Sequence, residues 1–159
     1  NLGDGLFPLA AFQRAGGQWS IGTDSHIGLN PLEELRILDY GQRVTSHRRN
    51  QFVSGNMGDS GRFGFDMALK AGRKAMGNQI EEYFKPGEPL DSIVINSQSP
   101  LIATCKVENI LSSLVYSGDR GNILGTIVNG EWRAKDGKHL RRDTILASFK
   151  KSMDELKIR

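Results

Sequence analysis

The chain has 159 residues, of which 38% are hydrophobic and 25% are charged, and its mean hydropathy is −0.40. These values are typical of a soluble globular protein that is long enough to bury a core of its own. No apolar run approaches the roughly 18 to 20 residues that a membrane span needs, so the sequence predicts no membrane partner.

The charge balance is mildly basic, with 21 Lys and Arg against 18 Asp and Glu, for a net charge of +3. The basic residues collect at 43–49 and 141–151, in segments with the spacing of amphipathic helices. Solvated helix faces explain these clusters, so we predict no nucleic-acid partner. A single cysteine, Cys105, and the absence of a visible signal peptide favour a cytoplasmic location.

The first part of the chain predicts a loop, a helix and a strand. Apolar residues at 7–12 have helical spacing and stop at Gly16-Gly17, a glycine helix end. Residues 18–23 are short, apolar and partly β-branched, which predicts a buried strand. A helix followed by a strand is the repeating step of wound and barrel folds.

Two longer helices are predicted next. Asn30 is a helix N-cap with Pro31 at the first helical position, and this helix is expected to run to about residue 48. The glycine-rich residues 54–62 predict a loop, and residues 63–76 predict a second helix that ends at Gly77.

From residue 78 onward the pattern favours strands and turns. Strands are predicted at 91–96, 123–128 and 131–135, with Asn129-Gly130 as a two-residue hairpin turn. Residues 107–116 are apolar and fit either a helix or an extended segment. An amphipathic helix is predicted at 141–157, and its apolar face carries Ile145, Leu146, Phe149, Met153 and Leu156.

Asp24 is the main candidate for a functional residue. It directly follows the predicted strand at 18–23, and barrel enzymes place their catalytic residues at the carboxyl ends of strands. One carboxylate is not a site, however, and capping of the following turn is the alternative that the residues alone leave open.

Three motifs near the start of the chain are distinctive: Leu2-Gly3-Asp4-Gly5-Leu6-Phe7-Pro8, Gly22-Thr23-Asp24-Ser25-His26, and Glu33-Glu34-Leu35-Arg36 through Arg48-Arg49-Asn50. Together they resemble formimidoylglutamate deiminase, a member of the amidohydrolase superfamily. Segments 71–77, 85–95 and 128–139 continue the resemblance to the end of the chain. The resemblance implies a hydrolase of histidine degradation that converts N-formimidoyl-L-glutamate, a small-molecule substrate, into N-formyl-L-glutamate and ammonia.

The resemblance also implies the fold class, which is α/β. The expected parts are the end of a metal-dependent (β/α)8 barrel, or TIM barrel, at 1–77, a portion of a small β-sandwich at 78–140, and a C-terminal helix at 141–159. The chain has no initiator methionine, so we expect it to be a piece of a longer protein. The resemblance implies that this piece is C-terminal and that its partner is the remaining N-terminal part of the same enzyme.

By the same resemblance, Asp24 is both a zinc ligand and the group that accepts a proton from a zinc-activated water. The histidine ligands of such a site are expected outside this chain, because His26, His47 and His139 lack His-x-His spacing. Four further residues are candidates for substrate binding or for orienting Asp24: His26, Ser25, Asn1 and Asp4. For His26, an ordinary loop histidine is the open alternative.

Two other functions stay open at this point. The parent protein is alternatively another amidohydrolase, such as an aromatic deaminase or a chlorohydrolase, because upstream loops set most of the substrate choice. The isolated chain is alternatively a non-catalytic interaction domain, since one carboxylate cannot hold catalytic zinc. We also expect a homo-oligomer, because part of a barrel exposes apolar faces that must be covered.

Overall fold

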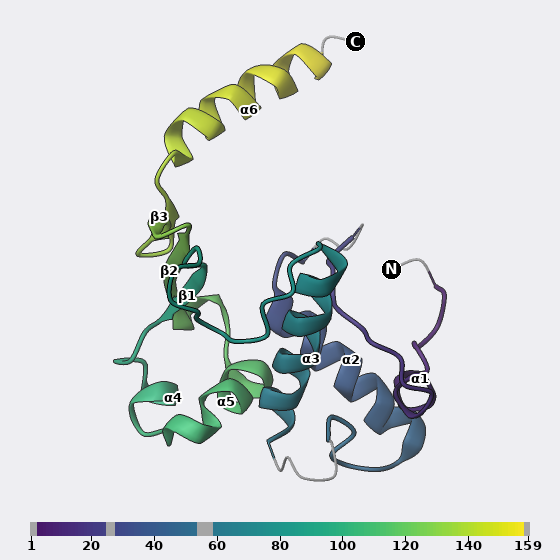
Figure 1. Ribbon diagram of the computed structural model, residues 1–159. Helices are drawn as coiled ribbons and strands as arrows, with labels where there is room; N and C mark the ends of the chain where they lie inside the picture. Colours follow the sequence, from purple (N-terminus) through teal and green to yellow (C-terminus); the bar gives the residue numbers. More distant parts are fainter. Residues whose placement is uncertain (1–2, 25–27, 54–58, 158–159) are drawn as a thin grey trace. The chain divides into compact units, whose positions relative to one another are not determined.

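The structure is a computed structural model, and it describes residues 3–24, 28–53 and 59–157 (Figure 1). The chain divides into two compact units. The first comprises Asn1–Lys85 with Ser97–Asn122, and the second comprises Pro86–Asn96 with Ile123–Arg159. The domain boundaries expected at residues 77 and 140 stay predictions, and the two units are described separately below.

The first unit is helical. Its elements are α1 (Leu9–Arg14), α2 (Pro31–Ser46), α3 (Ser60–Ala75), α4 (Pro100–Ala103) and α5 (Ile110–Ser117), with short 3-10 turns at Val107–Asn109 and Arg120–Asn122. The ambiguous segment 107–116 is therefore helical. Helix α5 packs against both α2 and α3. Its C-terminal end is held by Arg36, which donates hydrogen bonds of 2.6 Å to the carbonyls of Val115 and Gly118.

Helix α2 begins where the sequence predicts. The Asn30 side chain accepts a hydrogen bond of 3.1 Å from the Leu32 amide, which satisfies one of the unpaired donors at the helix start. The helix ends at Ser46 rather than near residue 48, because His47 adopts the left-handed conformation with φ 54°.

Helix α3 begins earlier than predicted. Asp59 is its N-cap and accepts a hydrogen bond of 2.7 Å from the Arg62 amide, so Ser60–Arg62 are helical and not part of a loop. Capping by an aspartate thus outweighs the low helix propensity of Gly61 and Gly64. The rest of the predicted loop, residues 54–58, lies outside the described residues.

The strand predicted at 18–23 is absent from the structure. Strands require hydrogen bonds to neighbouring strands, and the four strands of the described residues all belong to the sheet of the second unit. The segment is held by side chains instead. The Ser20 hydroxyl donates 2.9 Å to the Ala68 carbonyl, and the Trp19 ring lies 5.5 Å from the ring of Phe52.

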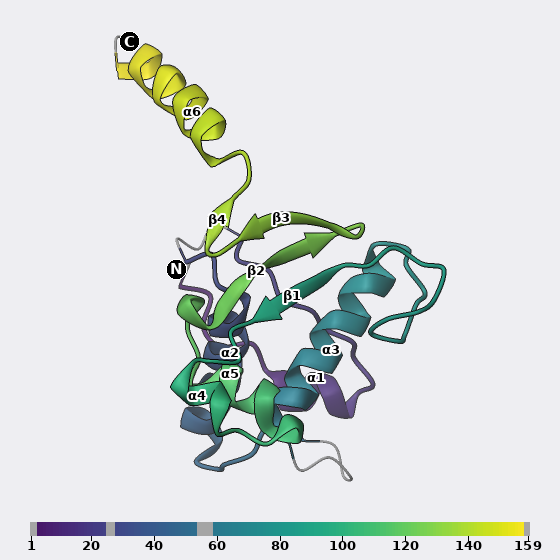
Figure 2. The ribbon, with the colours of Figure 1, turned by 90° about the vertical axis from the view of Figure 1, so that its left-hand side faces the viewer.

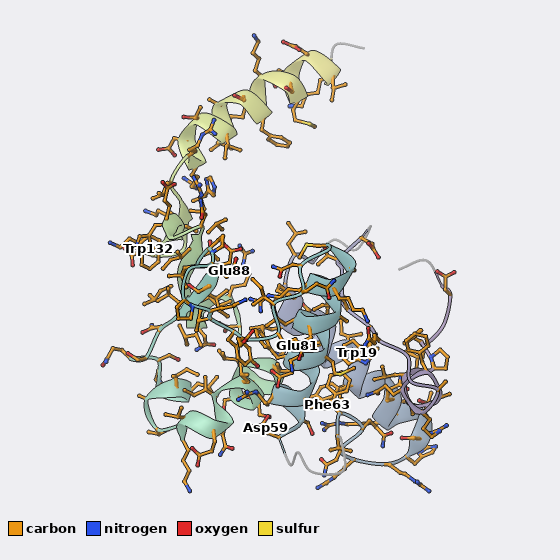
Figure 3. The ribbon with its side chains drawn as sticks, viewed as in Figure 1. Trp19, Asp59, Phe63, Glu81, Glu88 and Trp132 are labelled. Atoms are coloured by element: carbon orange, nitrogen blue, oxygen red, sulfur yellow. The ribbon has the colours of Figure 1, made fainter. Side chains whose placement is uncertain are left out.

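The core of the first unit is aromatic and aliphatic. Phe52 is fully buried, and its ring lies 5.5 Å from the ring of Trp19 and 6.3 Å from the ring of Phe63 in α3. Trp19 and Phe63 are labelled in Figure 3. The other buried apolar residues of this unit are Leu9, Leu32, Leu35, Ile102, Leu114 and Val115. This core joins the segment that precedes Asp24 to the long helices.

Helices α3 and α5 are in close contact at Gly61. The Ser112 hydroxyl donates to the Asp59 carboxylate at 2.5 Å and accepts from the Gly61 amide at 2.9 Å. A Cβ added at Gly61 would collide with the Ser112 backbone and stand 2.8 Å from the Leu111 carbonyl oxygen. Only glycine therefore permits this contact between the two helices.

Replacing Gly61 with alanine should lower the free energy of unfolding by about 1–3 kcal/mol, because rigid backbone atoms must move to admit the methyl group. Gly41→Ala in α2 is the matched control, since its Cβ would meet mainly the exposed side chain of Leu6. Urea denaturation measures both changes. Equal stability of the two variants would show that α3 and α5 are not in close contact at Gly61.

In its described residues, the second unit forms an antiparallel sheet and a helix. The sheet order is β1 (Ser92–Ile95), β2 (Ile123–Val128), β3 (Glu131–Lys135) and β4 (Lys138–His139) (Figure 2). The predicted turn at Asn129-Gly130 is confirmed, with φ 52° and 77°, the positive values that tight hairpin turns require. Helix α6 (Arg142–Lys157) follows β4. The expected mixture of helices and a small sheet is therefore confirmed.

Candidate functional site

A cavity of about 520 Å3 lies in the first unit, next to the segment that leads to Asp24. Its walls come from loop residues 5–7, from α1, from residues 18–24 and from α2. The polar residues in the lining are Gln18, Ser20, Asp24, Glu34 and Gln42. The remaining walls are largely apolar, as is usual for a pocket that takes a small molecule.

Asp24 lies at the edge of this cavity. It is exposed and has φ 40°, in the left-handed region that aspartate tolerates better than most residues. Its carboxylate lies close to Gly22, because a Cβ built at Gly22 would stand 3.4 Å from the Asp24 Oδ1 atom. An exposed carboxylate at a cavity edge is able to bind a cation or accept a proton.

Hydrogen bonds hold the walls of the cavity in place. The Gln42 side-chain amide donates 2.7 Å to the Phe7 carbonyl, which ties α2 to the loop before α1. The Ser20 hydroxyl is bonded to α3, as described above. Trp19 is 6% exposed, and its indole Nε1 has no hydrogen-bond partner among the described residues. Lys74 of α3 also donates a hydrogen bond of 3.0 Å to the Gln18 side chain, so the segment before Asp24 is held both by side-chain hydrogen bonds and by the packing of Trp19.

The predicted site residues are placed as follows. Asp24 lines the cavity, whereas Asp4 is exposed and is not in the lining, although its neighbour Gly5 is. Asn1, Ser25 and His26 lie outside the described residues. These assignments to a site stay predictions.

The sequence interpretation missed two polar residues of the cavity, Glu34 and Gln42. Both lie on α2, and together with Leu38 they are spaced i, i+4 and i+8, which places them on one face of the helix. That spacing is the signal that could have found them. The spacing predicts that the three residues share one face of α2. It does not predict that this face borders residues 18–24.

A second polar cluster joins α2 to α5. Asp39 is fully buried, forms an ion pair of 2.5 Å with Arg43, and accepts a hydrogen bond of 2.8 Å from the Tyr116 hydroxyl. The Arg43 guanidinium also lies 4.9 Å from the centre of the Tyr116 ring. Burial, reinforced by Asp39, raises the pKa of Tyr116 well above its usual range, so this phenol stays protonated and donates. The cluster does not line the cavity and is structural.

The described residues contain no group of three or more His, Cys, Asp or Glu side chains that could hold a metal ion. Within this part of the chain, Asp24 therefore has no cluster of metal-binding neighbours. In the same residues, no helix is both long enough and apolar enough to cross a membrane.

Comparison with known proteins gives relatives that extend beyond this chain. It is 33% identical to formimidoylglutamate deiminase of Pseudomonas aeruginosa over 98% of its length and 34% of the relative. It is 29% identical to 5-methylthioadenosine/S-adenosylhomocysteine deaminase of Thermococcus sibiricus, over 82% of this chain and 29% of the relative. The chain thus spans about a third of these relatives. No protein-family model matches it.

Solved structures agree with the sequence comparison. An amidohydrolase from Brucella melitensis has a TM-score of 0.86 and 33% identity, with 98% of this chain and 34% of that one covered. An adenosine deaminase from Xanthomonas campestris with bound zinc has a TM-score of 0.71 over 96% of this chain and 34% of that one, and at 17% identity it shows only a shared fold. Over nearly its whole length, the chain is therefore similar to about a third of formimidoylglutamate deiminase, consistent with a C-terminal portion of such an enzyme.

Proposed function

We propose that this chain is the C-terminal part of a hydrolytic deiminase that converts N-formimidoyl-L-glutamate into N-formyl-L-glutamate and ammonia. The observation that carries the proposal is the exposed carboxylate of Asp24 at the edge of a cavity, in a chain that matches formimidoylglutamate deiminase over 98% of its length. The reaction assigns the chain to histidine degradation, and a cytoplasmic location stays part of the prediction.

Asp24 is the residue of this chain that we assign to the reaction. A carboxylate oxygen is a common ligand of catalytic zinc, and the exposure of Asp24 leaves it accessible to an ion. Such sites take about three protein ligands, so we assign the missing ones to the part of the enzyme outside this chain. The zinc-bound adenosine deaminase of similar fold supports zinc as the metal.

The reaction needs a base and then an acid at the same place. A zinc ion held partly by Asp24 would supply a water whose pKa is lowered toward about 7. The carboxylate of Asp24 accepts the proton and holds it until the leaving nitrogen takes it up as ammonia. Glu34 and Gln42 line the same cavity as Asp24, and Gln42 holds its wall in place through the hydrogen bond to the Phe7 carbonyl.

The barrel assignment follows from the same proposal. We assign the first unit to the last helix, strand and helix of a (β/α)8 barrel, in which residues 18–23 become a strand once neighbouring strands are present. The antiparallel sheet of the second unit is assigned to the small β-sandwich. The N-terminal part of the enzyme is the partner that completes both.

A deaminase of the 5-methylthioadenosine type is the second candidate, because that relative is 29% identical over 82% of the chain. Ammonia release by a complete enzyme that includes this chain separates the two functions. The proposal expects release from N-formimidoyl-L-glutamate and not from 5-methylthioadenosine. The reverse preference would replace the first candidate with the second.

The isolated chain should bind zinc weakly and be inactive. With Asp24 as one ligand and no three-residue cluster in the described residues, we expect less than one zinc ion per ten chains after dialysis (about 0.1 per chain). Elemental analysis of the dialysed protein measures this ratio. Tight binding of one zinc per chain would mean that this chain carries a complete site of its own.

A further inference from the structure

Helix α6 presents an apolar face that is exposed among the described residues of its unit. Every residue from 142 to 157 is exposed, and four apolar side chains of this face are between 38% and 59% exposed. They are Leu146, Phe149, Met153 and Leu156. In Figure 1 the helix, drawn in yellow, leads from the strands of its unit to the C-terminal end of the chain.

The spacing of this face is that of a helix that pairs with another helix. The four residues follow one another at intervals of three, four and three, which is the a and d pattern of a coiled coil over two heptads. A stripe of this kind places its side chains between those of a facing helix. The stripe is therefore suited to packing against another helix and not against a flat sheet.

The charges beside the stripe indicate which helix fits. Asp143, Lys150 and Lys157 follow one another at seven-residue intervals, so they form one flanking row. In an antiparallel pair of α6 helices, this row faces the same row of the second copy. Asp143 then lies opposite the partner's Lys157 at both ends, and Lys150 lies opposite the partner's Lys150 at the centre.

We propose that α6 is a self-association surface that binds the α6 helix of a second copy of this chain in antiparallel orientation. In this arrangement Leu146 packs against the partner's Leu156, and Phe149 packs against the partner's Met153. Two opposite-charge contacts outnumber the one like-charge contact. In a parallel pair, Lys150 and Lys157 would face Ile145 and Ser152, which carry no charge.

Charge reversal tests the proposal on the full 159-residue chain by sedimentation over a concentration series. Asp143→Lys and Lys157→Asp should each weaken the dimer about tenfold, because each replaces two attractions with two repulsions. The double variant should restore the affinity of the original chain. Phe149→Lys, at the centre of the apolar stripe, should abolish the dimer, while Ser148→Lys on the outer face should not.

Cysteine cross-linking determines whether the two α6 helices are antiparallel. The variants are made in a Cys105→Ser background, so that the introduced cysteine is the one that reacts. In the antiparallel pair, Ser152 of one copy lies beside Ser152 of the second copy, so Ser152→Cys should form a disulfide dimer on mild oxidation. Ser148→Cys is the matched control and should not. Three results would overturn the proposal: a chain that stays monomeric, a dimer whose affinity the charge variants do not change, or a double variant whose affinity is not restored. The face would then be assigned to a contact with the rest of a longer protein. Self-cross-linking by Leu156→Cys in place of Ser152→Cys would contradict the antiparallel arrangement.

Discussion

Asp24→Asn should lower ammonia release from N-formimidoyl-L-glutamate by about 10²–10⁴-fold in a complete enzyme that includes this chain, because the amide cannot accept the proton that the leaving nitrogen needs. The loss should fall mainly on kcat, since proton transfer acts in the transition state. Zinc content should be measured alongside the rate, because Asp24 is also proposed as a ligand. Steady-state kinetics with a coupled ammonia assay measures the effect.

Asp136→Asn is the matched control for Asp24. Asp136 is also an aspartate with a positive φ, of 50° against 40° for Asp24, and it lies in a hairpin turn of the second unit. Asparagine tolerates this conformation as well as aspartate does, so the same chemical change is made in a similar backbone. The control should retain its rate. If both variants kept full activity, Asp24 would be a turn residue without a role in catalysis.

Asp39→Ala should lower the free energy of unfolding by about 3–5 kcal/mol, because it leaves the Arg43 guanidinium without its carboxylate at a site where Asp39 itself is fully buried. It also removes the acceptor for the Tyr116 hydroxyl, which lies 2.8 Å from the carboxylate. The buried hydrogen bond between α2 and α5 at this position is thus lost, while the bonds from Arg36 to Val115 and Gly118 remain. Urea denaturation followed by circular dichroism measures the change.

Asp66→Ala provides the comparison for Asp39. Asp66 also pairs with an arginine four positions away, Arg62, at 3.0 Å, but that arginine is 46% exposed, whereas Asp39 also accepts a hydrogen bond from Tyr116 of α5. Its loss should cost about 1 kcal/mol or less. A similar cost for the two substitutions would mean that Asp39 is hydrated in solution and that α5 does not cover it.

Local signals in the sequence were sufficient where one segment specifies its own structure. Helix α2 was predicted from Asn30 and Pro31, which act on the first turn alone. The Asn129-Gly130 turn was predicted because few other residue pairs adopt two positive φ values. Helix α3 was placed three residues late, because the glycines near its start were given more weight than the Asp59 cap.

Contacts between distant segments decided the rest of the fold. The apolar pattern at 18–23 is that of a strand, but a strand forms only when a neighbour pairs with it, and the described residues contain none beside this segment. The apolar pattern of residues 107–116 is compatible with a helix or with an extended segment. In the structure it is helical, and the helix α5 packs against α2 and α3. The burial of Asp39 likewise depends on Tyr116, which is 77 positions away.

The sequence by itself determined the start of α2, the Asn129-Gly130 turn, the resemblance to a deiminase and the choice of Asp24 as a candidate, because each depends on neighbouring residues or on a contiguous motif. Only the tertiary structure decided that Glu34 and Gln42 share a cavity with Asp24, and that Asp39 is buried between two helices. The reason is physical. Burial and the lining of a cavity are set by which distant side chains meet, and neither periodicity nor capping specifies that meeting.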